Sequence, residues 1–211
     1  MLIKKGAEAN LYLEEWHGRK VIMKRRLPKK YRTHELDEQI RSQRTIHEPQ
    51  AMHRAKEAGV PTPTIFAVDV GEATIIMEFI EGRQIKQVLD DLPTKERLHL
   101  SHHIGTLIGC LHSHDIIHGD LTTSNMILTQ HNRIALVDFG LSEQSRELEA
   151  RGVDLHLMKR ALQSTHYKCA KECFKAVMDG YIESVGREAG QRVIHKIEEI
   201  EKRGRYISER E

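Results

Sequence analysis

Short apolar runs separated by glycine or polar residues are the main pattern in residues 1–80. The runs at residues 11–13 and 21–23 lie on either side of His17-Gly18, which is typical of two neighbouring strands joined by a turn. Two further runs, at residues 65–68 and 74–77, lie on either side of Gly71. The pattern predicts a small lobe made mainly of β-strands.

Residues 35–58 interrupt these strands with a helical pattern that contains Pro49. Proline costs about 3 kcal/mol inside a helix but is tolerated in its first turn. Thr45-Ile46-His47-Glu48 has the spacing of a capping box, in which the Glu48 side chain turns back to the Thr45 amide. We therefore predict a short first helix and a second helix that begins near Thr45 and ends at Gly59.

From Gly82 onwards the pattern is mainly helical. Apolar residues recur at turn spacing in residues 94–114, and helical patterns follow at residues 153–185 and 193–202. Apolar runs at residues 126–128 and 134–137 predict a short hairpin of strands. The chain is predicted to adopt an α+β fold with two lobes, a β-rich N-lobe with one helix (residues 1–80) and a helical C-lobe (residues 81–211).

The composition agrees with a globular protein of this kind. The 211 residues are 39% hydrophobic, and 33 Lys and Arg stand against 31 Asp and Glu, a formal net charge of +2. This balance argues against a disordered chain and against a generic polycationic nucleic-acid binder. No stretch approaches the roughly 18 apolar residues of a membrane span, and the first residues do not resemble a signal peptide. We expect a cytoplasmic protein that does not enter the membrane.

The three cysteines are too few to indicate a disulfide framework. His166, Cys169 and Cys173 have the spacing of metal ligands on one helix face, but a fourth ligand with similar spacing is missing. We favour the packing of small side chains on a helix over a metal site there.

The charge is unevenly distributed along the chain. Eight cations and no acid lie within residues 19–32: Arg19, Lys20, Lys24, Arg25, Arg26, Lys29, Lys30 and Arg32. Such a block either forms a solvated hairpin and loop or contacts a phosphate-rich partner. Residues 187–211 hold seven cations and six acids, as a solvated helix does, with a small basic group at Lys202-Arg203-Gly204-Arg205.

The residues best suited to chemistry lie near the predicted hairpin. His118-Gly119-Asp120-Leu121 is followed by Asn125 and then by Asp138-Phe139-Gly140. Phosphoryl transfer from ATP needs oxygen ligands that hold Mg²⁺ and a separate carboxylate that orients the attacking hydroxyl. Asn125 and Asp138, at the ends of the two predicted strands, can converge on the metal and leave Asp120 as the base. Six specified residues at fixed offsets make this a specific signal.

These residues resemble the catalytic loop and the Asp-Phe-Gly motif of protein kinases, with His118 in the catalytic loop. The resemblance implies that Lys24, at the end of an apolar run, binds the ATP phosphates and that Glu48 holds Lys24 through an ion pair. The capping role of Glu48 competes with this ion pair, and the sequence leaves both open.

A kinase-like cleft also implies a loop over the phosphates and a hinge against adenine. The loop departs from the kinase pattern of three spaced glycines, because the residues in its place are Gly6, Ala7, Glu8, Ala9 and Asn10. In the implied hinge, the backbone of Glu78 and Ile80 meets the edge of adenine, and Met77 narrows the pocket behind it.

Only thirteen residues separate Gly140 from Asp154, and no Ala-Pro-Glu follows, so an activation segment and a peptide platform do not fit. The chain is similar to the atypical kinase/ATPase of the KEOPS complex, the PRPK-like family. The similarity runs nearly from end to end, at Gly6-Ala7-Glu8-Ala9, Arg44-Thr45, residues 59–63, residues 118–125, Val153-Asp154-Leu155 and Arg203-Gly204-Arg205.

This resemblance implies an Mg-ATP-dependent serine/threonine kinase and ATPase that phosphorylates itself and some proteins. Its ATP hydrolysis would support threonylcarbamoylation of the tRNA adenosine beside the anticodon. The implied protein partners are the universal tRNA threonylcarbamoyltransferase and a small regulatory subunit. We expect tRNA to contact the basic block and the C-terminal tail.

Two alternatives stay open. A small-molecule phosphotransferase of the aminoglycoside or choline type carries the same His-Gly-Asp-Leu, but it usually has more helices than the seventy-one residues after Gly140 provide. A pseudokinase scaffold would bind tRNA or the transferase without chemistry, which the complete set of Asp120, Asn125 and Asp138 argues against.

Overall fold

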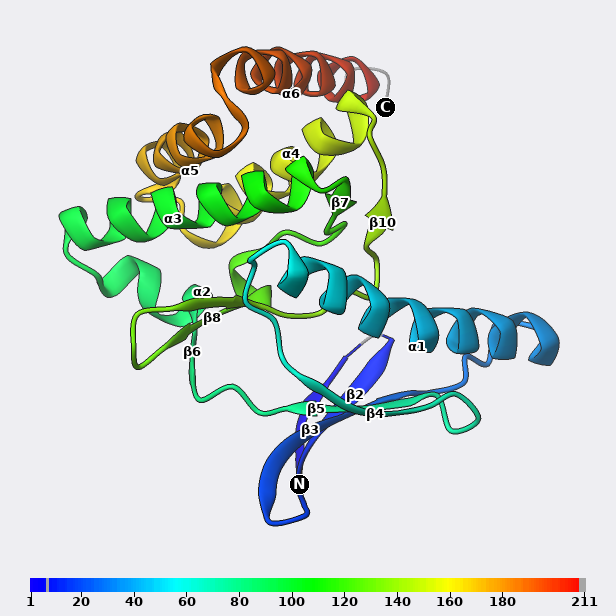
Figure 1. Ribbon diagram of the computed structural model, residues 1–211. Helices are drawn as coiled ribbons and strands as arrows, with labels where there is room; N and C mark the ends of the chain where they lie inside the picture. The colour runs from blue at the N-terminus through cyan, green and yellow to red at the C-terminus, as the bar shows by residue number, and fades with distance from the viewer. Residues whose placement is uncertain (7, 209–211) are drawn as a thin grey trace.

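The computed structural model describes residues 1–6 and 8–208, and the side chains among them up to residue 203. A five-stranded antiparallel sheet forms one end of the molecule, helices of the C-terminal half form the other, and α1 (His34–Glu57) lies between them (Figure 1). The strand order is β1-β2-β3-β5-β4. The strands are β1 (Leu2–Lys5), β2 (Ala9–Trp16), β3 (Arg19–Arg26), β4 (Ile65–Asp69) and β5 (Thr74–Glu78).

The predicted hairpin between residues 11 and 23 is confirmed as β2 and β3. Trp16 pairs with Arg19, and the two residues between them, His17 and Gly18, have φ angles of 49° and 74°. A two-residue type I′ turn requires positive φ at both central positions, and glycine adopts it without steric cost. The turn residues therefore set the register of β3, the strand that carries Lys24.

The prediction that Pro49 divides the helix of the N-lobe is wrong, because α1 is continuous from His34 to Glu57. The Thr45 hydroxyl donates to the Arg41 carbonyl at 2.7 Å within the helix, and Glu48 bonds to β3 instead of to the Thr45 amide. Proline removes one backbone hydrogen bond from α1. Tertiary contacts of its inner face outweigh this local cost; the buried residues of that face are Asp37, Thr45, Glu48, Ala51, Met52 and Ala55.

The C-terminal half holds most of the helices. They are α2 (Ile85–Val88), η1 (Leu89–Asp91), α3 (Thr94–Ser113), η2 (Thr123–Asn125), α4 (Leu148–Thr165), α5 (Ala170–Val185) and α6 (Arg187–Ser208). The predicted hairpin is confirmed as β8 (Met126–Thr129) and β9 (Ile134–Leu136), and β6 (Gly82–Gln84) extends it. β7 (Ile116–Ile117) pairs with β10 (Glu143–Gln144), and these strands are too short to show a sequence period.

Helices α3 and α5 lie in close contact because both carry glycine where they meet. A Cβ atom at Gly105 would lie 1.8 Å from the Val177 carbonyl oxygen, and one at Gly180 would lie 2.0 Å from the His102 carbonyl oxygen. Any larger residue at either position would push the helices apart.

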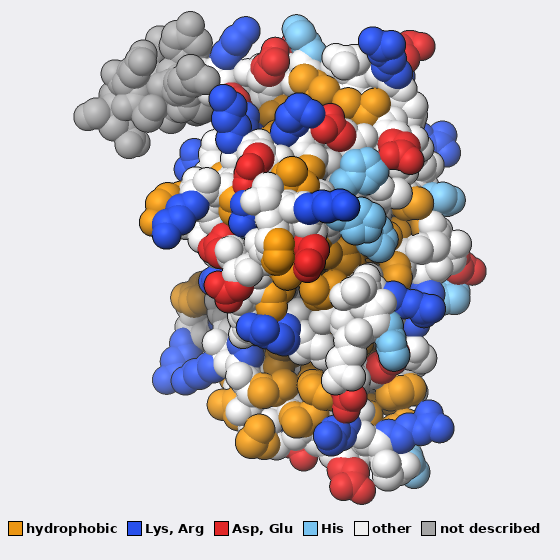
Figure 2. Space-filling model, turned by 90° about the vertical axis from the view of Figure 1, so that its left-hand side faces the viewer, with side chains coloured by type: hydrophobic (Ala, Val, Ile, Leu, Met, Phe, Trp, Pro, Cys, Tyr) orange, Lys and Arg blue, Asp and Glu red, His pale blue; other side chains and the backbone are white. Residues whose placement is uncertain are grey.

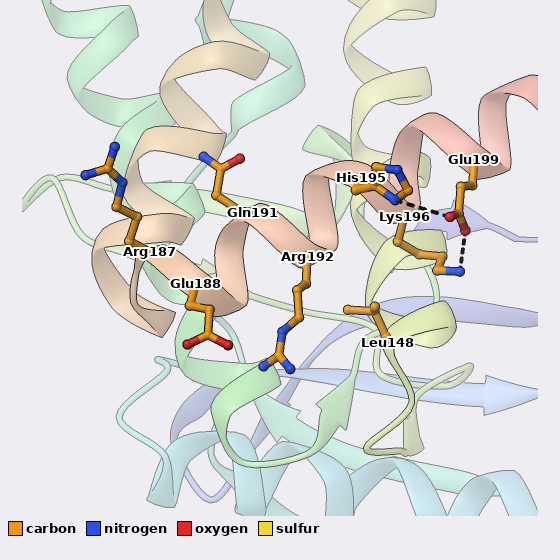
Figure 3. Close-up of a pocket in the computed structure, with 8 residues that line it drawn as sticks. All are labelled: Leu148, Arg187, Glu188, Gln191, Arg192, His195, Lys196 and Glu199. Atoms are coloured by element: carbon orange, nitrogen blue, oxygen red, sulfur yellow. Dashed lines mark hydrogen bonds and ion pairs between the residues drawn. The ribbon is translucent and has the colours of Figure 1, made fainter.

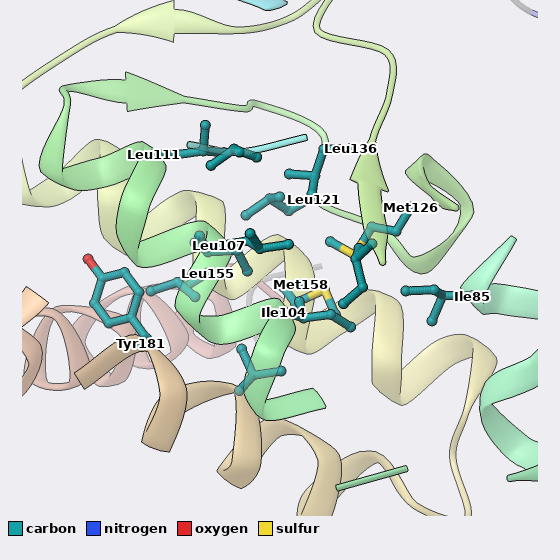
Figure 4. Packing of buried hydrophobic residues seen from close by; sticks show 14 of the residues in the cluster. Ile85, Ile104, Leu107, Leu111, Leu121, Met126, Leu136, Leu155, Met158 and Tyr181 are labelled. Atoms are coloured by element: carbon teal, nitrogen blue, oxygen red, sulfur yellow. The ribbon is translucent and has the colours of Figure 1, made fainter. Parts of the chain in front are cut away.

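The core of the C-lobe supports both catalytic motifs. Side chains from α3, α4 and α5 pack against those of β8, β9 and the segment before them (Figure 4). Leu121 directly follows Asp120, Phe139 directly follows Asp138, and both apolar side chains are 0% exposed. Burial of such a side chain stabilises the fold by about 1.5–3 kcal/mol. The core thus fixes the backbone on which the two carboxylates are carried.

The α+β fold with two lobes is confirmed, whereas the boundary after residue 80 stays a prediction. In the described part of the chain, seven residues lie between Gly140 and α4, which leaves no room for an activation segment. None of the described helices is both long and apolar enough to cross a bilayer.

Candidate active site

Most of the predicted site residues meet in a cleft between the sheet and the C-lobe. A cavity of about 750 Å³ is lined by Lys24, Glu48, Asn125 and Asp138. The predicted hinge residues Met77, Glu78 and Ile80 line it as well, together with the apolar side chains of Leu11, Ile22, Ile127 and Val137. A cavity of about 240 Å³ shares Lys24 and Asp138 with the first and is also lined by Asp120, Gly6, Glu8 and Ala9. The cleft therefore has an apolar part suited to a planar base and a charged part suited to phosphates.

Lys24 lies at the centre of the charged part. Its Nζ atom donates to Glu48 Oε1 at 2.7 Å and to Asp138 Oδ1 at 2.6 Å. Burial lowers the pKa of Lys24, but the charges of Glu48 and Asp138 outweigh burial and raise it above its ordinary value. Lys24 therefore stays charged. Of the two roles left open for Glu48, the structure shows the ion pair and not the capping box.

Asp138 follows β9 with a φ of 65°, the left-handed region in which aspartate is one of the more readily accepted residues. Burial raises the pKa of its carboxyl, but the charge of Lys24 and its hydrogen bond outweigh burial and hold the pKa below the ordinary value. Asp138 is therefore a carboxylate near neutral pH, with Oδ1 directed to Lys24.

Asp120 and Asn125 are joined by two hydrogen bonds. Asn125 Nδ2 donates to the Asp120 carboxylate at 2.8 Å and to the Asp120 carbonyl at 3.0 Å. Because the amide nitrogen is used in this way, the Asn125 Oδ1 atom is the one left for a ligand. Asn125 belongs to η2, directly before β8, so the short helical turn sets its position.

His118 links the catalytic loop to the segment that carries Asp138. The Asp120 amide donates to His118 Nδ1 at 3.3 Å, so Nε2 carries the hydrogen and donates to the Val137 carbonyl at 3.3 Å. Burial lowers the pKa of His118, and the charge of Asp154 only partly opposes this effect. His118 is therefore neutral near pH 7 and holds the two segments together, with its ring 4.5 Å from the Phe139 ring.

Asp154 of α4 holds the other side of the catalytic loop, a role that the sequence does not indicate. Its fully buried carboxylate accepts from the amides of His118 and Gly119, both at 2.9 Å, and from His112 Nε2 at 3.2 Å. Gly119 has a φ of 78°, and a Cβ atom there would lie 2.2 Å from the Leu141 carbonyl oxygen. In the sequence, Asp154 could have been singled out because it is a charged residue between the apolar Val153 and Leu155 within a helical pattern.

The predicted phosphate loop is only partly at the cleft. The Gly6 amide donates to the Ala9 carbonyl at 3.0 Å, and Glu8 forms an ion pair with Arg44 of α1. Ala7 lies outside the described residues. Asn10 is buried in β2, where its Nδ2 donates to the Tyr12 hydroxyl at 3.2 Å, and it lines neither cavity.

The hinge residues occupy the back and edge of the larger cavity. Met77, at the end of β5, is 6% exposed. Glu78 is fixed to the segment just before β4, because its amide donates to the Thr64 carbonyl at 2.8 Å and its carboxylate accepts from the Thr64 amide at 2.9 Å. Ile80 lies just beyond β5.

The basic block does not form one surface. Strand alternation turns Lys24 and Arg26 inward, where they are 6% and 4% exposed, so neither can contact an RNA surface. Arg25 pairs with Glu72, while Arg19, Lys20 and Lys30 are exposed. On the face drawn in Figure 2, cationic and acidic side chains are mixed. Contact of the exposed cations with tRNA stays a prediction, and the Arg205 side chain of the tail lies outside the described ones.

A groove of about 690 Å³ on α6 contains none of the predicted site residues. It is lined by charged side chains such as Arg187, Arg192 and Lys196, with Leu148 of α4 at its wall (Figure 3). The residues that could hold phosphates and a metal lie in the cleft and not in this groove, so the groove is not the candidate nucleotide site.

No group of His, Cys, Asp and Glu within the described residues could hold a metal ion by itself. His166 is instead hydrogen-bonded to Asp90 at 2.9 Å through Nδ1 and to the Thr123 hydroxyl at 3.0 Å through Nε2. Cys169 lies beside the same aspartate. These contacts tie His166 to Thr123 of the catalytic loop, and the choice between packing and a metal site stays a prediction.

Comparison with known proteins agrees with this geometry. Residues 5–178 match the family model of the protein kinase domain. The KEOPS complex subunit Bud32 of Pyrococcus abyssi is 49% identical over 211 residues, which cover 97% of this chain and 96% of that protein. The chain belongs to the Bud32 family of protein kinases. This confirms the resemblance to the KEOPS kinase family.

Longer relatives contain the same unit. A "probable bifunctional tRNA threonylcarbamoyladenosine biosynthesis protein" of Methanothermobacter thermautotrophicus is 43% identical over 97% of this chain, which spans only 36% of that relative. Among solved structures, the Rio2 kinase from Chaetomium thermophilum has a TM-score of 0.65 at 19% identity, over 94% of this chain and 71% of that one. The Rio2 likeness shows that a Bud32-family chain shares the kinase fold.

Proposed function

We propose that this chain is an Mg²⁺- and ATP-dependent serine/threonine kinase and ATPase of the KEOPS complex in the cytoplasm. Its ATP turnover would support formation of threonylcarbamoyladenosine in tRNA. The observation that carries the proposal is Lys24, bound to both Glu48 and Asp138 in a cavity that also holds Asn125. The names of the relatives support the pathway.

The cleft offers each part of ATP a matching surface. The apolar side chains of Leu11, Ile22 and Val137 would enclose the base, with Glu78 and Ile80 at its edge. Lys24 would bind the phosphates, because its ammonium group is charged and already positioned by Glu48. Gly6 and its neighbours would cover the phosphates from β1 and β2.

The donor set fits Mg²⁺. Asn125 Oδ1 and the ionised Asp138 carboxylate are hard oxygen ligands of the kind this cation prefers, and both residues line the same cavity. When bound, the ion would neutralise charge on the phosphates. The chain's own contribution is to hold these two side chains from separate segments, Asn125 through Asp120 and Asp138 through Lys24.

Asp120 would act as the base. The hydrogen bond from Asn125 orients its carboxylate, and the bonds of His118 and Asp154 hold the loop that carries it. In that position it would accept the proton of a serine or threonine hydroxyl, or of water. Orientation together with proton transfer contributes roughly 10²–10⁴-fold to such a reaction.

Specificity would come from fixed partners. With only seven residues between Gly140 and α4, the described chain offers no platform for a substrate peptide. We infer that the universal tRNA threonylcarbamoyltransferase and a small regulatory subunit supply this surface, with tRNA bound across the assembly.

ATP hydrolysis by the full chain tests the proposal, measured alone, with the transferase, and with the transferase and tRNA. We expect slow turnover and autophosphorylation by the chain alone, and faster hydrolysis with both partners. Retention of tRNA with no ATP consumption under any of these conditions would favour the scaffold. Rapid phosphorylation of an aminoglycoside or of choline would favour the small-molecule phosphotransferase.

A further inference from the structure

Arg26 is buried beside the candidate active site although it carries a permanent charge. Successive side chains of a strand point to opposite faces, so Arg26 shares the inward face of β3 with Lys24, and Arg25 between them is exposed. The Arg26 side chain is 3% exposed. A guanidinium group this deeply buried needs charged or polar partners, because it cannot lose its proton.

Both side-chain partners of Arg26 lie on one turn of α1. One guanidinium nitrogen donates to Glu48 Oε2, and the other donates to the Thr45 hydroxyl at 3.3 Å. Glu48 Oε1 accepts from Lys24 Nζ at 2.7 Å. Two cations of the same strand therefore hold the two oxygens of Glu48. Arg26 also lines the smaller cavity, but both of its terminal nitrogens already donate to side chains of α1.

The contact spans the turn of α1 that proline weakens. Pro49 cannot donate to the Thr45 carbonyl, so the helix lacks one backbone hydrogen bond at this point. Arg26 contacts the side chains of Thr45 and Glu48 and so holds that turn against β3. The Thr45 hydroxyl uses its hydrogen on the Arg41 carbonyl, which leaves its lone pairs for Arg26.

Kinases that are switched by phosphorylation control the position of this helix through the activation segment. The described chain has no segment of that length between Gly140 and α4. Direct contacts hold α1 instead: Arg44, near its middle, pairs with Glu8, and Arg54, in its last turn, donates to Gln144 at 2.9 Å.

We propose that Arg26 is a positioning residue that keeps Glu48, and through it Lys24, in place for phosphoryl transfer without any activating modification. The inference rests on the proposed function. Arg26 acts through Glu48 and not on the substrate. When Lys24 turns from Asp138 to the phosphates, Arg26 keeps the Glu48 charge compensated, so α1 stays where it is.

A double-mutant cycle in the full chain tests this proposal. We expect Arg26→Met and Glu48→Gln each to lower kcat for ATP hydrolysis by at least about tenfold, and the double variant to be no slower than Glu48→Gln. Arg26→Lys restores a cation beside Glu48 and should recover most of the turnover. Losses that multiply in the double variant, or no rescue by lysine, would overturn the proposal, because a merely structural role predicts both.

Amide hydrogen exchange, measured without nucleotide, tests the role of Arg26 independently of ATP turnover. Arg26→Met should speed exchange in residues 45–57 by about tenfold or more and leave α3 and α5 unchanged. Arg146→Met, which removes an exposed arginine paired with Asp115, is the matched control and should change neither region. Unchanged exchange in α1 would overturn the role of Arg26, whereas altered exchange in a chain without any ATP turnover would support the contact and contradict the proposed function.

Discussion

At the scale of single residues, the charges of the cleft are arranged by the protein itself. Lys24 contacts Glu48 and Asp138 at 2.7 and 2.6 Å, and the pKa directions of Lys24 and Asp138 both favour the charged forms. Charges that are fixed in advance cost little reorganisation during the reaction. The stability contributed by the lowered pKa of Asp138 is present above its ordinary value of 3.8 and is lost as the pH falls through the lowered pKa.

His118 gives a test of pH dependence at the same scale. Its pKa lies below 6.5 in the folded protein, so between the two values the unfolded chain binds a proton that the native chain does not. The free energy of unfolding should therefore fall as the pH is lowered below about 6.5, and His118→Asn should reduce this slope. Urea denaturation at several pH values measures it. In the His118→Asn variant some slope should remain, because His103 and His156 also have lowered pKa values. A slope identical to that of the wild type would contradict the claim that His118 is buried in its neutral form.

At the scale of elements, α1 is held by its tertiary contacts more than by its local sequence. Its centre is fixed to β3 through Glu48, and its inner face is buried in the core. A helix with these contacts can accept a missing backbone hydrogen bond in its interior. The same contacts explain why the helix does not begin anew at Thr45.

Pro49→Ala follows from this view of α1. The new amide can donate to the Thr45 carbonyl, which favours the folded state, while the greater freedom of the unfolded chain opposes part of the gain. We expect the free energy of unfolding to rise by about 1–2 kcal/mol in urea denaturation. Gln50→Ala at the exposed neighbouring position is the control and should change it little. A loss of stability in Pro49→Ala would show that the helix depends on the proline ring.

The longer C-lobe helices and the strands β2, β3, β4, β5, β8 and β9 were predictable, because their apolar patterns extend over several residues, whereas β6, β7 and β10 are too short to show one. Asp120, Asn125 and Asp138 were predictable because their offsets are fixed by the chemistry. The continuous α1 was not, since a capping box is local and the competing partner Lys24 lies on another element. The role of Asp154 was equally hidden, although the residue is part of the family resemblance, because its partners are the His112 side chain and the backbone amides of His118 and Gly119, 36 and 35 residues earlier.

At the scale of the whole molecule, the kinase fold is present without the segment that usually selects a protein substrate. The exposed cations of the basic block lie on the N-lobe sheet and on the connection that follows it, apart from the buried pair Lys24 and Arg26. Under the proposed function, a partner could contact these cations without entering the nucleotide cleft.

Charge reversal tests the predicted tRNA contact. Lys20→Glu with Lys30→Glu should weaken tRNA binding and flatten its dependence on salt. A protein that makes fewer phosphate contacts releases fewer counterions when it binds. Filter binding across a salt series measures both quantities. Reversal of the exposed Lys175 of α5 is the control. An unchanged salt slope in the Lys20 and Lys30 variant would assign these residues to a solvated hairpin and loop.

The central claim is that Asp138, held by Lys24, makes this cleft a site of ATP turnover. The most direct measurement is the rate of ATP hydrolysis by Asp138→Asn with the transferase and tRNA present, beside Asp179→Asn, the same change at an exposed carboxylate of α5. We predict a loss of about a hundredfold or more for Asp138→Asn and wild-type turnover for Asp179→Asn. Wild-type turnover by Asp138→Asn would contradict the assignment of the site.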